Sequence, residues 1–209
     1  SGQHFNTSVI VSPEGEIVLT YRKTHLPGHA EYEPERTHQH LEKRYFLPGD
    51  TGFNVARSQD VLMGMAICND RRWPESWRVM GLQGVELVSI GYNTPSQNNL
   101  SKTEGLEKRL YHHELSVCAG AYQNSTYAIA VAKCGMEDGN HMIGGSIIVD
   151  PDGFVLARAT GEGDELIVAE ADFDKCAFGK STVFNFAAHR RIEHYGLIAS
   201  QTGVKEPQQ

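Results

Sequence analysis

Cysteine is scarce in this sequence, and the four cysteines among its 209 residues form no Cys-x-x-Cys pair. The sequence therefore does not indicate a disulfide framework or a zinc site, and scattered single cysteines are typical of reduced thiols in the cytoplasm. No apolar run approaches the roughly 20 residues that a membrane span requires. The chain starts with Ser1 rather than Met, and no charged and then apolar leader is visible, so we expect a cytoplasmic protein.

Positive charge is also in short supply. Lysine and arginine number 19 against 26 aspartates and glutamates, which gives a net charge of −7. Nucleic acids and anionic membranes bind basic surfaces, so this balance disfavours both as partners. A hydrophobic share of 40% and a charged share of 22% are ordinary for a globular protein, and the length fits a single domain over residues 1–209.

Two segments repeat one plan of apolar run, turn and apolar run. They are TSVIVSPEGEIVLTYR (7–22) and GSIIVDPDGFVLARAT (145–160). Proline pre-sets the backbone and glycine supplies a positive φ in both turns, so each segment is predicted to be a β-hairpin. The likeness suggests two sheets related by approximate symmetry; the alternative is that hairpin turns simply resemble one another.

Strands and helices are expected to alternate between the hairpins. The spacing predicts helices over 74–83 and 101–122, the second with a capping box of Ser101 and Glu104. Residues 24–52 are predicted to be a long functional loop and the last 25 or so a docking tail. This alternation favours helices layered on sheets. Strands are expected at 61–67, 86–91, 127–133 and 165–171.

Cys68 follows a predicted strand and precedes a predicted helix. The positive end of the helix dipole and the charges of Arg71 and Arg72 would favour a thiolate, the form that a nucleophile needs. The alternative is a buried structural cysteine, as we expect for Cys118, Cys134 and Cys176.

Five segments together resemble the nitrilase superfamily, and within it most closely the N-carbamoyl-D-amino-acid amidohydrolases. They are YRKTHLPGH (21–29), QHLEKRYFLPGD (39–50), AICNDRRWPESWRVMGLQG (66–84), GYNTP (91–95) and HRRIEHYGLI (189–198). The resemblance spans nearly the whole chain. It implies an α/β fold, a four-layer α-β-β-α sandwich, with a Glu-Lys-Cys catalytic set, no metal or other cofactor, and a homodimer or homotetramer when complete.

The resemblance assigns roles to three residues. Cys68 matches the nucleophile, Lys23 the ammonium that stabilises the oxyanion, and Glu42 a second, supporting glutamate. The general-base glutamate of the family has no counterpart, since Glu14 and Glu16 lie in or beside a hairpin turn. The chain is thus expected to correspond to the C-terminal two-thirds of such an enzyme. It should be almost inactive alone, because acid–base catalysis contributes about 10²- to 10⁴-fold.

The substrate implied is a small molecule, an N-carbamoyl-D-amino acid, hydrolysed to D-amino acid, ammonia and carbon dioxide. Arg71 and Arg72 are suited to its carboxylate, because a guanidinium donates in a bidentate fork. The other residues expected at the substrate are Asn69, Asn93 and Thr94 as polar contacts, and His25, His40 and His112 as histidines that frame the pocket.

Three other functions stay open. The first is another enzyme of the superfamily, such as an aliphatic amidase, a nitrilase or a β-ureidopropionase. The second is a non-catalytic binding or assembly subunit. The third is a metal-dependent hydrolase that uses the loop histidines His25, His29, His38 and His40.

Overall fold

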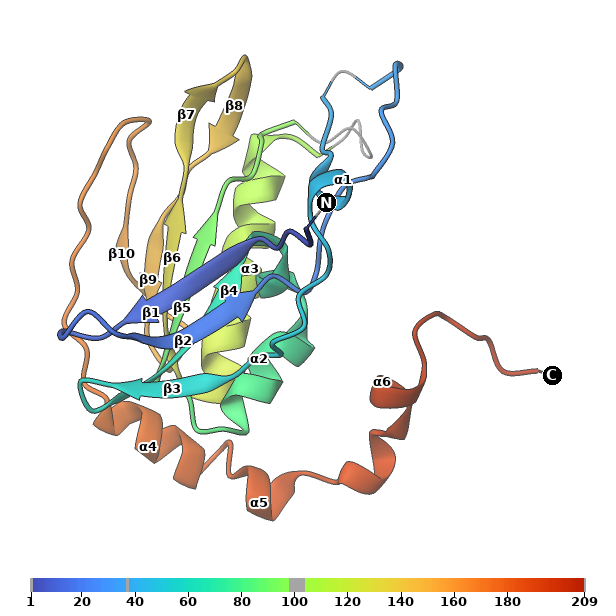
Figure 1. Ribbon diagram of the computed structural model, residues 1–209. Coiled ribbons are helices and arrows are strands. Elements are labelled where there is room, and N and C mark those ends of the chain that lie inside the picture. Colours follow the sequence, from blue (N-terminus) through green and yellow to red (C-terminus); the bar gives the residue numbers. More distant parts are fainter. Residues whose placement is uncertain (1, 37, 98–103, 209) are drawn as a thin grey trace.

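The computed structural model describes residues 2–36, 38–97 and 104–208. Its centre is a six-stranded mixed sheet in the order β10-β9-β6-β5-β4-β3 (Figure 1). The three inner strands β4, β5 and β6 run parallel, and the other strands pair antiparallel with their neighbours. The strands are β3 (Val55–Ser58), β4 (Val61–Ile67), β5 (Leu87–Tyr92), β6 (Tyr127–Ala132), β9 (Ile147–Val149) and β10 (Val155–Arg158).

The parallel strands are rich in apolar residues because both of their faces are covered. Helices α2 (Pro74–Gly81) and α3 (Leu106–Asn124) are the crossovers that connect β4 to β5 and β5 to β6. Val88, Ile90 and Ala128 are fully buried in the resulting core. Since β4 and β5 are parallel neighbours, the residues that follow them emerge at the same edge of the sheet.

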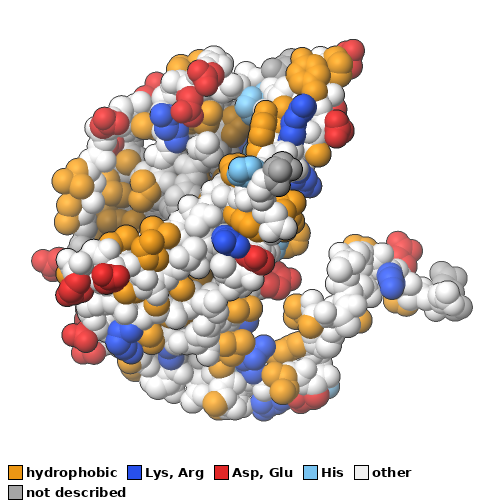
Figure 2. Space-filling view, viewed as in Figure 1, with side chains coloured by type: hydrophobic (Ala, Val, Ile, Leu, Met, Phe, Trp, Pro, Cys, Tyr) orange, Lys and Arg blue, Asp and Glu red, His pale blue; other side chains and the backbone are white. Residues whose placement is uncertain are grey.

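The opposite face of the sheet carries the hairpin of β1 (Thr7–Val11) and β2 (Ile17–Arg22) (Figure 1). Ile10 and Tyr21 of the hairpin pack on Met65 of β4 in a small second core. The expected α/β sandwich is therefore confirmed. The described residues form three layers, and no described helix covers the hairpin, whose outward side chains are exposed (Figure 2): Val9, Val11, Ile17 and Val18.

Smaller elements surround these layers. Among its described residues the long loop after β2 contains one helix, α1 (Glu42–Tyr45). A 3-10 turn, η1 (Cys68–Arg72), lies between β4 and α2. A second hairpin joins β7 (Cys134–Glu137) to β8 (Asn140–Ile143). The C-terminal segment runs along one end of the sheet and away from it (Figure 1), through α4 (Asp174–Ser181), α5 (Phe186–His189), η2 (Ile192–His194) and α6 (Gly196–Ser200). No described helix has the length and apolar composition to cross a membrane.

Most expected elements are confirmed, with three differences. The strand expected over 165–171 is wrong: this segment is irregular, and Leu166 and Val168 are exposed without a partner strand. Strand β3 and the β7–β8 hairpin were not expected. Helix α3 begins at Leu106 rather than 101, and Ser101 of the expected capping box lies outside the described residues.

The contact between α2 and α3 depends on glycine. A Cβ atom added at Gly120 would overlap the indole ring of Trp77, which is buried between the helices and donates from Nε1 to Arg71 O at 2.8 Å. The helices can therefore approach closely only where this side chain is absent.

We expect Gly120→Ala to lower the free energy of unfolding by about 1–3 kcal/mol, because the overlap outweighs the better helix propensity of alanine. Urea unfolding measures the effect. Gly196→Ala is the matched control, since a Cβ there meets nothing within 4 Å. Equal stability of the two variants would contradict this account of the helix contact.

Candidate active site

Cys68 lies at the carboxyl end of β4, in the first position of η1. Its φ of +49° is in the left-handed region, which a residue with a side chain adopts rarely and mostly at functional turns. The residue is only 7% exposed, yet it lines a cavity of about 450 Å³. The thiol is thus held at the wall of a space large enough for a small organic molecule.

The cavity is assembled from segments that lie far apart in the sequence. Its lining residues come from the loop after β2, from η1 and the residue after it, from the residues after β5, and from the first turn of α3. Among the predicted substrate contacts, those that line it are Asn69, Arg72, Asn93, Thr94 and His40. His38, which sequence reasoning considered only as a metal ligand, also lines the cavity, and no site role was assigned to the lining residues Arg36, Lys43, Trp73, Gln97 and Arg109.

Arg71 does not line this cavity, contrary to the prediction that it pairs with Arg72. It is 1% exposed, and its guanidinium donates to Cys68 O at 2.6 Å and to Thr94 Oγ1 at 3.4 Å. Its Cζ also lies 4.4 Å from the centre of the Tyr92 ring. Arg71 therefore supports the turn that carries Cys68, and of these two arginines Arg72 is the one that lines the cavity.

Lys23 and Glu42 form a buried ion pair beside the cavity. Lys23 Nζ donates to both oxygens of Glu42, at 2.6 and 2.8 Å, and Lys23 is 2% exposed. His40, which lines the cavity, lies 3.6 Å from Glu42 through Nε2. The predicted pairing of this lysine with this glutamate is thus present in the structure.

Glu42 stays ionised under ordinary conditions. Burial by itself would raise its pKa, but contacts with His40, Lys23 and Asn6 outweigh burial and lower the pKa to about 2. The carboxylate therefore orients the amine of Lys23 through two hydrogen bonds.

Asp70 connects the segment that carries Lys23 to the segment that carries Cys68. It is fully buried and accepts from Tyr21 Oη at 2.7 Å, His25 N at 2.9 Å and Ile67 N at 3.0 Å. Lys23 lies between Tyr21 and His25 in the chain, and Cys68 directly follows Ile67. One carboxylate therefore fixes the positions of both groups.

His25 is not part of the cavity lining, contrary to expectation. Its Nδ1 lies 2.9 Å from Asp70 Oδ1, within hydrogen-bond distance. The ring is stacked between Phe53 and Trp73, at centroid distances of 5.8 and 4.8 Å. His25 thus positions the loop and does not frame the pocket.

His112 is also outside the cavity. It is half exposed on α3 and pairs with Glu104 at 2.9 Å. The inward histidine is its neighbour His113, whose Nε2 lies 3.0 Å from Tyr92 Oη. Burial, and after it the charge of Arg71, lowers the pKa of His113 to about 3, so this ring is neutral and structural.

The cavity lining is strongly cationic. Arg36, Lys43, Arg72 and Arg109 line it together with two histidines, whereas none of the described lining residues is an aspartate or glutamate. Such a surface attracts anions. As for metals, the described part of the chain contains no group of three His, Cys, Asp or Glu side chains placed to hold an ion.

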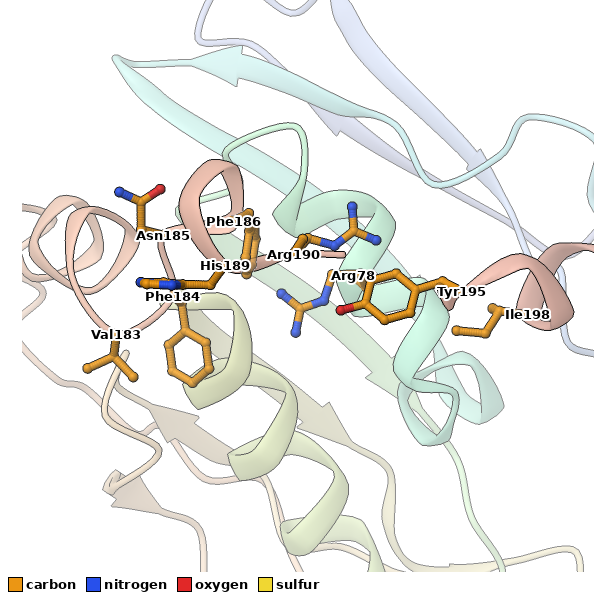
Figure 3. Close-up of a pocket in the computed structure, with 9 residues that line it drawn as sticks. All are labelled: Arg78, Val183, Phe184, Asn185, Phe186, His189, Arg190, Tyr195 and Ile198. Carbon is orange, nitrogen blue, oxygen red and sulfur yellow. The ribbon is translucent and has the colours of Figure 1, made fainter. Parts of the chain in front are cut away.

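A second cavity, of about 330 Å³, lies between α2 and the C-terminal segment (Figure 3). Arg78 of α2 stacks on Phe186 at 4.2 Å, and Tyr195 and Arg190 approach it from the C-terminal segment. Cys68 does not line this cavity. The first part of the C-terminal segment therefore contacts α2, whereas residues 196–208 are almost all exposed and lead away from the sheet (Figure 1), so the expected docking of the tail stays a prediction.

Comparison with known proteins places the chain in a family. A sequence model of the family described as carbon-nitrogen hydrolase matches residues 1–180. An N-carbamoylputrescine amidase of Oryza sativa is 31% identical over 97% of this chain and 65% of its own length. An (R)-stereoselective amidase of a Pseudomonas species is 34% identical over 91% of this chain and 60% of its own length. The crystal structure of a carbon-nitrogen hydrolase from Helicobacter pylori superposes with a TM-score of 0.80 at 26% identity, covering 95% of this chain and 67% of that one.

We expect Asp70→Asn to lower both stability and the reactivity of Cys68, because an asparagine has one acceptor oxygen for the donors that now share two. The loss should be about 1–3 kcal/mol in urea unfolding. Asp50→Asn is the control: Asp50 pairs with Arg22 at 2.8 Å but is 62% exposed. Equal losses for the two variants would show that Asp70 has no special part in the site.

Glu42→Gln should reduce stability in a way that depends on pH. The pKa of Glu42 lies near 2 in the folded chain, below its ordinary value of 4.5, so its stabilisation is complete above 4.5. The stability difference between the parent and the variant should therefore shrink as pH falls from 4.5 towards 2. Urea unfolding at a series of pH values checks this, and a constant difference would refute it.

Proposed function

Because the chain belongs to the carbon-nitrogen hydrolase family, we propose that it hydrolyses the carbamoyl C–N bond of N-carbamoyl-D-amino acids. The observation that carries this proposal is the shared cavity of Cys68 and Arg72, which puts a nucleophile and a carboxylate-binding fork on one small molecule. The chain spans about 65% of the length of the curated relatives that it matches, so the activity is proposed for the whole protein.

The chemistry would proceed in two stages. The Cys68 thiolate attacks the carbamoyl carbon, and Lys23, held by Glu42, stabilises the oxyanion. Ammonia leaves after it gains a proton, and a carbamoyl thioester remains on Cys68. Water then cleaves the thioester, and the released carbamate decomposes to carbon dioxide and the free amino acid.

The charge of the cavity favours an amino-acid substrate over the second candidate, an N-carbamoylputrescine amidase. Relatives with that name favour the second candidate, but the far end of N-carbamoylputrescine is a cationic amine. The described lining offers that amine no carboxylate and several like charges. The D-configuration draws support from the relative described as (R)-stereoselective.

We also propose that this chain alone turns over slowly. None of the described residues that line the cavity is a carboxylate suited to activate water. General acid–base catalysis contributes about 10²- to 10⁴-fold to such reactions. Tests of the site therefore need a readout of binding as well as of ammonia release.

Protection of Cys68 from iodoacetamide provides that readout. N-carbamoyl-D-alanine should slow alkylation of the Cys68 peptide, followed by mass spectrometry, and leave Cys134 unaffected because Cys134 lies outside the cavity. Arg72→Gln should weaken protection by about 10- to 100-fold, the value of charge-assisted hydrogen bonds to a carboxylate.

Arg57→Gln serves as the control, since Arg57 is on β3 and donates to Asp60 O. N-carbamoyl-L-alanine and N-carbamoylputrescine are the comparison ligands. If N-carbamoylputrescine protects better than N-carbamoyl-D-alanine, the second candidate replaces the proposal.

A further inference from the structure

We propose that Arg109 makes the site selective for carbamoyl amino acids with a second negative charge, such as a side-chain carboxylate. The inference rests on the proposed function, and it names a substrate class that Arg72 alone does not determine. Arg109 would bind the side-chain carboxylate while Arg72 binds the main-chain one.

Arg109 is a buried cation that faces the reaction site. The residue is 8% exposed, comes from the first turn of α3 and lines the same cavity as Cys68 and Arg72. Its Nε is buried and meets no hydrogen-bond acceptor among the described residues. The guanidinium therefore carries a buried donor for which the described residues supply no acceptor.

The protein itself neutralises Arg109 incompletely. Glu104 lies 3.5 Å from Nη1 of Arg109, but the same carboxylate also pairs with His112 at 2.9 Å. Burial lowers the pKa of Arg109 more than the charge of Glu104 raises it, and the nearby charge of Arg72 lowers it further; an anion bound between the two arginines would offset that repulsion. A second carboxylate on the ligand would allow each arginine a carboxylate of its own.

The remaining cations of the lining are less suited to the second carboxylate. Arg36 already pairs with Glu33, its neighbour on the loop. Lys43 is exposed, so water screens its charge. Arg109 is therefore the cation for which a second ligand charge is worth most, and an uncharged side chain would leave it unpaired in a buried position.

N-carbamoyl-D-aspartate and N-carbamoyl-D-asparagine test this directly, because they have nearly the same shape and differ in one charge. With Cys68 protection as the readout, the aspartate compound should bind the parent chain at least about 10-fold more tightly. Arg109→Gln should remove that difference by weakening the aspartate compound alone. Arg109→Lys should retain part of it.

The outcomes separate the two proposals. If neither compound protects Cys68, the proposed function fails. If both protect the parent chain equally, the function stands and the selectivity is overturned, and this measurement needs no variant. If Arg109→Gln weakens both compounds equally, Arg109 binds the main-chain carboxylate and the inference is also overturned. Arg57→Gln should leave the ratio unchanged.

Discussion

The site depends on the hydrogen bonds that the buried carboxylate of Asp70 accepts. The carboxylate holds Tyr21 and His25, which flank Lys23, and the amide of Ile67, which precedes Cys68. A buried charge is stable only when its hydrogen bonds are complete, so these donors must stay together for the fold to persist. The hydrogen bonds that the carboxylate of Asp70 accepts therefore also set the position of the Lys23 amine relative to the Cys68 thiol.

Around this carboxylate the charges fall into two zones. Lys23 and Glu42 form a closed pair with no net charge, buried beside the cavity. The cavity lining has excess positive charge, and much of it is exposed towards solvent. The first zone suits chemistry at the carbamoyl carbon and the second suits recognition of what is attached to it. The net charge of −7 does not show that the cavity lining is positive, because it is a sum over the whole chain.

The sequence predicted what is local. Strand β4 ends where an apolar run meets Cys68, and Asn69 and Arg72 reach the cavity from the same turn, whereas Arg71 of that turn is buried away from it. Residue types alone do not show which side chains of a helix face the core. On α3 the buried face runs back from Ala121 through Val117 to His113 and Arg109, so extending that spacing would have chosen His113 over His112. Strand β3 was missed because a short edge strand of mixed residues has no clear period.

The stacking of Trp73 on His25 has an optical consequence. The indole is 46% exposed, lines the cavity and lies at an interplanar angle of 8° to the imidazole. The sequence has only two tryptophans, and Trp77 is buried between the helices. Emission from Trp73 is therefore sensitive to any molecule that enters the cavity beside it. The chain contains its own fluorophore at the mouth of the cavity, and occupancy can be followed without a label.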